Sequence, residues 1–197
     1  MEKQGLFTKE NVGKGVFIFT QNGNFISSKF WGLYEQSEKP VGVAILADRK
    51  LLVALEGSEK SLVLLNLKKE LPGEKLESWD KARTESDGMQ KTKDLDALGS
   101  PAAQFCLDYE CGQIGKGQWY LETAADAQLK FDHKKELDIA LAIAGGNAIE
   151  TDDWHWTSTR RYENSNWVFD WYIEGRINIY QSYVYRVRPV SAFLSTL

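Results

Sequence analysis

The 197-residue sequence contains little proline, cysteine and histidine, with four, two and two residues respectively. So few prolines are not typical of a proline-rich linker, and two cysteines are too few for a small protein stapled by disulfides. Cys106 and Cys111 match no zinc or redox spacing, so we expect two free thiols. A formal net charge of −4 at pH 7 argues against a basic protein that wraps nucleic acid, and we expect no nucleic-acid partner.

Long apolar runs are absent as well. No stretch approaches the roughly eighteen apolar residues that span a bilayer, and the N-terminus lacks the apolar core of a signal peptide. We therefore expect a soluble chain with no membrane span. A leader removed from the natural protein would leave no trace in this sequence, so the native compartment stays open.

The motifs of common enzymes are also missing. The sequence contains no Gly-x-Ser-x-Gly, Walker loop, dinucleotide glycine fingerprint or His-Glu-x-x-His. Glu150, Asp152, Asp153 and His155 offer oxygen and nitrogen ligands, but calcium needs more oxygens in a fixed loop, and a solvated acidic loop is the favoured interpretation. We therefore predict a protein that is not an enzyme, with no catalytic residue, no metal and no cofactor.

Aromatic residues are what the sequence has in excess. It holds seven tryptophans and eight tyrosines, and ten of the 32 residues from Trp154 to Tyr185 are aromatic. The last lysine is Lys135, so every cation beyond it is an arginine. Interfaces favour Tyr, Trp and Arg over Lys, and antibody binding loops have a similar composition. The segment 154–185 is therefore a candidate binding surface, with a chance clustering as the alternative.

The first half of the chain predicts short strands joined by turns. We expect a flexible tail at residues 1–12, followed by one domain at residues 13–197. Asn22-Gly23 between two β-prone runs, 15–20 and 25–28, predicts a hairpin. Runs 40–46 and 51–55 predict a second strand pair. The polar stretch 79–99 is expected to be a long surface connection with one short helix.

Helix signals follow. Ser100 and Pro101 are typical of an N-cap and first helical position, and they predict a helix that ends near Tyr109. Thr123 with Asp126 three residues later is a capping-box arrangement. A further helix is expected at 134–144, ended by Gly145-Gly146.

The C-terminal region predicts an antiparallel pair of strands around Gly175. The alternation from 167 to 172 directs Trp167, Phe169 and Trp171 to the core. Val168, Asp170 and Tyr172 then point outward. In the partner strand, Ile177 and Ile179 face opposite to Arg176, Asn178 and Tyr180.

Several short motifs, in a characteristic order, resemble one bacterial family. They are Gly117-Gln-Trp-Tyr-Leu121, Gly145-Gly146, Trp156-Thr-Ser-Thr159, Trp167, Gly175, Tyr185-Arg-Val-Arg-Pro-Val190 and Ala192-Phe193. The family has the C-type lectin fold, and the resemblance extends over residues 15–193. It implies an α+β chain with short antiparallel strands and two or three helices. Glu122 departs from the proline usual in the family.

The family includes the variable proteins of diversity-generating retroelements. In these proteins a hypervariable C-terminal repeat, mutated at template adenines, provides ligand or receptor binding at a cell surface or on a phage. By this resemblance the fixed positions are Trp156, Ser158, Thr159, Trp167, Gly175, Arg186, Arg188 and Pro189. Arg186 and Arg188 are expected to pack their stems and pair with carboxylates.

The positions between the fixed ones are the candidate ligand-binding residues: His155, Arg160, Tyr162, Val168, Asp170, Tyr172, Arg176, Asn178, Tyr180 and Tyr183. The expected partner is a protein or glycan on another cell or surface, and the oligomeric state is left open. Plain solvated surface is the alternative for these side chains. The alternative function is a non-diversified structural or adhesion module of a cell-surface or phage tail protein.

Overall fold

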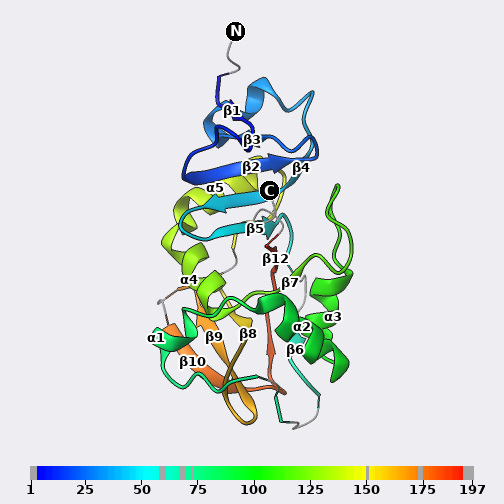
Figure 1. The fold of residues 1–197 in the computed structure, drawn as a ribbon, viewed down its shortest axis with the longest axis vertical. Coiled ribbons are helices and arrows are strands. Elements are labelled where there is room, and N and C mark those ends of the chain that lie inside the picture. Colours follow the sequence, from blue (N-terminus) through cyan, green and yellow to red (C-terminus); the bar gives the residue numbers. More distant parts are fainter. Residues whose placement is uncertain are drawn as a thin grey trace.

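A computed structural model describes residues 4–57, 61–66, 70–71, 73–149, 151–172 and 175–192. This part of the chain is mixed α and β, with antiparallel sheets and six helices. The helix number exceeds the two or three that the family resemblance implied. Figure 1 shows a large sheet toward the N-terminal end of the molecule and a three-stranded sheet at the opposite end.

The large sheet has seven strands in the order β1-β3-β2-β4-β5-β12-β7. They are β1 (Leu6–Phe7), β2 (Gly15–Thr20), β3 (Phe25–Ile26), β4 (Pro40–Leu46), β5 (Lys50–Ala54), β7 (Tyr120–Leu121) and β12 (Pro189–Ser191). The hairpin at Asn22-Gly23 is confirmed, and Gly23 adopts the left-handed φ of 78° that favours glycine. The pair of β4 and β5 is confirmed as well.

Residues 4–12 differ from the flexible tail that we expected at 1–12. Leu6 pairs with Ile26 and Phe7 with Phe25, so β1 extends the sheet as its edge strand. The Phe7 ring also lies edge-on to Phe17, with centroids 5.6 Å apart. Two apolar side chains in a polar segment are enough to attach it, because they add apolar area to an existing sheet edge.

The helix signals in the middle of the chain are confirmed. Helix α3 (Pro101–Asp108) begins after Ser100, whose Oγ accepts from the Ala103 amide at 3.1 Å. Helix α4 (Ala124–Asp132) has the full capping box of Thr123 and Asp126. Helix α5 (Lys134–Ile143) ends before Gly145, which has a φ of +79°. Each cap satisfies amide or carbonyl groups that the helix end would leave unbonded.

The expected surface connection at 79–99 instead forms two helices, α1 (Trp79–Ala82) and α2 (Gly88–Ala97). The α2 helix is not superficial, since Thr92 is fully buried and Leu95 is 2% exposed. The Thr92 Oγ1 donates to the Gly88 carbonyl and accepts from the Leu121 amide, which joins α2 to β7. The polar sequence did not predict that α2 packs against the core, because only a few of its residues, such as Thr92 and Leu95, are buried.

The second sheet contains β8 (Trp154–Tyr162), β9 (Ser165–Asp170) and β10 (Gly175–Tyr180), in the order β10-β9-β8. The expected antiparallel pair around Gly175 is confirmed as β9 and β10. A small sheet of β6 (Leu62–Val63) and β11 (Val184–Tyr185) lies beside it, and a 3-10 helix, η1 (Ser28–Leu33), follows β3.

Two ion pairs involve α4, and one of them is buried on both sides. Lys130 Nζ lies 2.5 Å from Glu122 Oε2, and both side chains are fully buried. Arg49 contacts Asp126 at 2.8 Å. Burial raises the pKa of Glu122 to about 7, although Lys130 opposes the shift. The same burial lowers the pKa of Lys130. Glu122, where the resemblance led us to expect proline, is thus the partner of Lys130.

Hydrogen bonds from β8 tie it to the beginning of α4. The Ser158 amide and hydroxyl both donate to the Glu122 carbonyl, at 2.7 and 3.2 Å. Thr159 Oγ1 accepts from the Ala124 amide at 2.8 Å. These bonds give the Trp156-Thr-Ser-Thr159 motif a structural role in holding the second sheet on the scaffold.

Candidate binding surface

The tryptophans expected in the core are confirmed there. Trp156 is fully buried, and Trp167 and Trp171 are 4% and 3% exposed, with Phe169 fully buried beside them. Trp156 Nε1 donates to the Leu62 carbonyl and Trp167 Nε1 to the Leu76 carbonyl, both at 2.8 Å. A buried indole N–H needs a partner, and these bonds anchor the second sheet to distant segments.

Arg188 is 2% exposed, and its guanidinium forms hydrogen bonds with backbone carbonyls, which our prediction of carboxylate pairing did not include. Its guanidinium donates to the carbonyls of Ala54, Leu55, Asn147 and Ala148, at distances of 2.9–3.2 Å. A guanidinium presents five N–H donors, so it can satisfy several carbonyls where β5 and the segment after α5 meet. The role of Arg188 is therefore structural.

Three candidate binding residues are buried, which corrects their assignment to the surface. Val168 is 1% exposed, because β9 is covered on both faces and this side chain packs in a cluster with Trp156 and Leu64. His155 is 2% exposed and lies edge-on to Trp171, with centroids 5.5 Å apart. Arg160 is 5% exposed.

The burial of Arg160 has a specific cause. Its guanidinium donates to the carbonyls of Leu71 and Gly73 and contacts Glu70 at 3.1 Å. Residues 70–71 and 73–76 lie about 90 positions earlier in the chain, so sequence periodicity could not indicate that they cover Arg160. Arg160 holds that segment on the second sheet.

Most of the remaining candidates lie at the surface. Tyr172 is 81% exposed, Tyr180 59%, Tyr183 55% and Tyr162 40%, and Asn178 is also exposed. Asp170 is half-buried. The backbone of Arg176 lies in β10 opposite Phe169, but its side chain falls outside the described part of the structure.

A chain of contacts connects the exposed tyrosines into what we call the tyrosine row: Tyr180, Tyr183, Tyr185, Trp154 and Tyr172. The Tyr183 amide donates to the Tyr180 carbonyl, and the Tyr183 ring stacks on Tyr185 with centroids 6.5 Å apart. Tyr185 lies 5.4 Å from Trp154. Asp170 completes the row, since it accepts from Trp154 Nε1 at 2.7 Å and from the Tyr172 amide at 2.9 Å.

An acidic hollow of about 330 Å³ opens beside one end of the tyrosine row. It is lined by Thr151, Asp152, Asp153, Trp154, Asp170, Tyr172 and Tyr185. Asp153 accepts from Ser61 Oγ and from the Trp154 amide, so this part of the acidic loop is anchored. Partial burial and the carboxylate of Asp153 raise the pKa of the Tyr185 hydroxyl. The hollow therefore offers aromatic walls together with negative charge.

Sequence reasoning missed Arg161, the neighbour of Arg160. The Arg161 guanidinium lies 4.2 Å from the centroid of Trp167 and 5.0 Å from that of Tyr162. It also donates to Asn178 Oδ1 at 2.8 Å. The sequence did not indicate which of the two adjacent arginines faces outward. Bulges in the pairing of β8 with β9 interrupt the alternation of side chains that would have predicted it.

Cys106 and Cys111 are free thiols as expected. Among the described residues, no group of three or more His, Cys, Asp or Glu side chains is placed to hold a metal ion. No helix in that part of the chain combines the length and apolarity needed to cross a bilayer. The chain matches no protein-family model and no curated protein.

Proposed function

We propose that this protein is a ligand- or receptor-binding protein that presents the tyrosine row on a rigid α+β scaffold of the C-type lectin type. The observation that carries the proposal is the separation of aromatic residues into a buried set and an exposed set within one segment. Trp156, Phe169 and Trp171 are buried, whereas Tyr172 and Tyr180 are mostly exposed. In this proposal the segment belongs to a diversity-generating retroelement, and the chain has no catalytic role.

The physical support is that exposed positions tolerate substitution at small cost. Surface changes away from special features usually alter stability by about 0.5 kcal/mol or less, whereas truncating a buried aromatic costs about 3–5 kcal/mol. Tyrosine also supplies a large contact area at the cost of only two side-chain torsions. A set of exposed tyrosines can therefore be exchanged for other contacts while the core below them persists.

The acidic hollow favours a partner that presents cationic or hydroxyl-rich groups. Carboxylates of Asp152 and Asp153 attract lysine or arginine side chains, and the rings of Trp154 and Tyr172 provide faces on which a cation or a sugar ring can lie. A protein or glycan on another cell or surface has these groups. The contact would be strongest at low ionic strength, because the carboxylates are near the surface.

Sequencing the locus from many individuals tests the diversification. We expect substitutions to concentrate at Tyr172, Arg176, Asn178, Tyr180 and Tyr183, to follow template adenines, and to accompany a neighbouring reverse transcriptase gene. Uniform drift along the chain, without such a gene, would instead support the non-diversified adhesion or structural module.

Paired substitution libraries test the scaffold argument. The first library randomises Tyr172, Asn178 and Tyr180, and the matched control randomises three buried positions in the same two hairpins, His155, Arg160 and Val168. Thermal unfolding of individual clones should be near wild type in the first library and mostly lost in the control. Frequent unfolding in the first library would overturn the proposal.

A further inference from the structure

A second hollow, of about 310 Å³, lies far from the tyrosine row, against β3 and the ends of β4 and β5. Its volume is at the lower end of the range for small-molecule pockets, about 300–1,000 Å³. Five apolar or small residues and three lysines line it. The lining residues are Lys9, Val12, Gly13, Lys14, Phe25, Leu46, Ala47 and Lys50.

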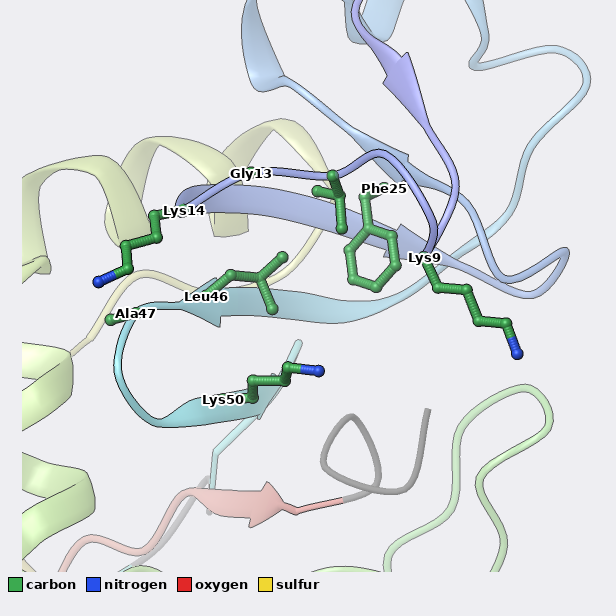
Figure 2. A pocket seen from close by; sticks show the side chains of 8 residues that line it. Lys9, Gly13, Lys14, Phe25, Leu46, Ala47 and Lys50 are labelled. Atoms are coloured by element: carbon green, nitrogen blue, oxygen red, sulfur yellow. The ribbon is translucent and has the colours of Figure 1, made fainter.

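Two residues of the apolar part of the hollow pack into the core. Phe25 is 2% exposed and Leu46 is 7% exposed, so both are held by the core beneath them. The Phe25 ring contacts Phe19 at 5.1 Å and Phe17 at 6.5 Å between centroids. Figure 2 shows the Phe25 ring and the Leu46 side chain together on one side of the hollow. A fixed apolar wall of this kind binds a hydrocarbon group without reorganising.

The charged part of the hollow is purely cationic. Lys14 is compensated, since its Nζ lies 2.5 Å from Asp48 Oδ1, and in Figure 2 its side chain extends away from Phe25. Lys9 and Lys50 form no ion pair with any residue in the described part of the chain. The lining of the hollow therefore combines the ammonium groups of Lys9 and Lys50 with apolar residues and includes no acidic residue.

We propose that this hollow binds a small amphipathic carboxylate, of the chemical class of a medium-chain fatty acid. The hydrocarbon chain would lie on Val12 and on the accessible edges of Phe25 and Leu46, where burial of each methylene contributes to affinity. The carboxylate would face Lys9 and Lys50. A neutral or cationic amphiphile of the same length satisfies only the apolar wall. The site is independent of the tyrosine row, so it stands whether or not the proposed function holds.

Calorimetric titration of the whole chain with octanoate tests the proposal. Octan-1-ol and octylammonium are the matched probes, because they keep the hydrocarbon chain and change only the head group. We expect octanoate to bind more tightly than either, and to weaken as salt rises from about 50 mM to about 300 mM, since the lysines are exposed to screening. Equal affinity for the three probes, or no octanoate binding, would refute the proposal.

Two variants locate the binding. Each exposed charge pair contributes modestly, so Lys9→Gln and Lys50→Gln should each weaken octanoate about two- to fivefold and act together in the double variant. Lys135→Gln is the control, since Lys135 is exposed on α5 and does not line the hollow. It should leave the affinity unchanged.

A third variant adds a bulky side chain beside the hollow without removing charge. A side-chain atom added at Gly13 would meet nothing within 4 Å, so Gly13→Trp fits the backbone and places a bulky group at the lining. We expect octanoate affinity to fall at least tenfold while the unfolding temperature stays near that of wild type. Full octanoate affinity in a folded Gly13→Trp variant would place the binding elsewhere and overturn the assignment.

Discussion

The buried pair of Glu122 and Lys130 makes a pH-dependent prediction for Lys130→Met. Methionine preserves most of the side-chain length, so the main change is loss of the positive charge 2.5 Å from Glu122. In the wild-type fold, burial raises the pKa of Glu122 to about 7, and Lys130 holds it below the value that burial alone would produce. Buried glutamates without a partner reach pKa values of about 8–9.

The sign of the effect follows from proton binding. An unfolded glutamate has a pKa of about 4.3, so above that pH the folded state holds a proton that the unfolded state has lost. Stability contributed by Glu122 therefore decreases as the pH rises toward its folded pKa. In wild type this decrease ends near pH 7. In Lys130→Met it continues to higher pH.

The magnitude comes from the extension of that window. One pKa unit corresponds to about 1.4 kcal/mol, so extending the loss from about pH 7 to about pH 8.5 adds about 2 kcal/mol of destabilisation. Urea unfolding followed by tryptophan fluorescence, at about pH 6 and about pH 8.5, measures the free energy of unfolding. The penalty of Lys130→Met should be about 2 kcal/mol larger at the higher pH.

A double variant provides the control. Glu122→Gln/Lys130→Met removes both charges, so its own free energy of unfolding should lack the pH dependence that Glu122 causes. If the Lys130→Met penalty is the same at both pH values, Glu122 is not the group that titrates and the argument is wrong.

Three further predictions concern the scaffold, each measured by chemical or thermal unfolding. Trp156→Ala should destabilise the fold by about 3–5 kcal/mol, because the side chain is fully buried, whereas Tyr172→Ala should change stability by about 0.5 kcal/mol or less. Comparable losses for the two would contradict the division into core and surface. Thr123→Ala removes the capping-box hydroxyl of α4 and should cost about 0.5–2 kcal/mol, and no loss would show that Asp126 alone caps the helix. Gly145→Ala should cost about 1–2 kcal/mol for its left-handed φ, whereas Gly146→Ala should cost more, because its Cβ would lie 2.4 Å from the Leu55 carbonyl oxygen. The reverse order would contradict that contact.

The division between buried and exposed aromatics could be predicted only in part. Trp167 and Phe169 in β9 and Trp171 just after it are all buried, as their spacing indicated. Phe169 and Trp171 pack in one core cluster and Trp167 in another. The opposite phase of the same strand did not follow the rule, because Val168 is covered by the segment that contains β6 and by β11. Alternation indicates which side chains share a face and does not indicate whether a second layer covers the other face.

The sequence by itself determined the local features of this protein. The caps at Ser100 and Thr123, the turn at Asn22-Gly23 and the end of α5 at Gly145 each depend on bonds or torsions within a few residues. Tertiary structure alone decided which candidate binding residues are accessible. Arg160 is buried by a segment about 90 positions away and Arg161 is not, because packing between distant segments has no counterpart in local spacing.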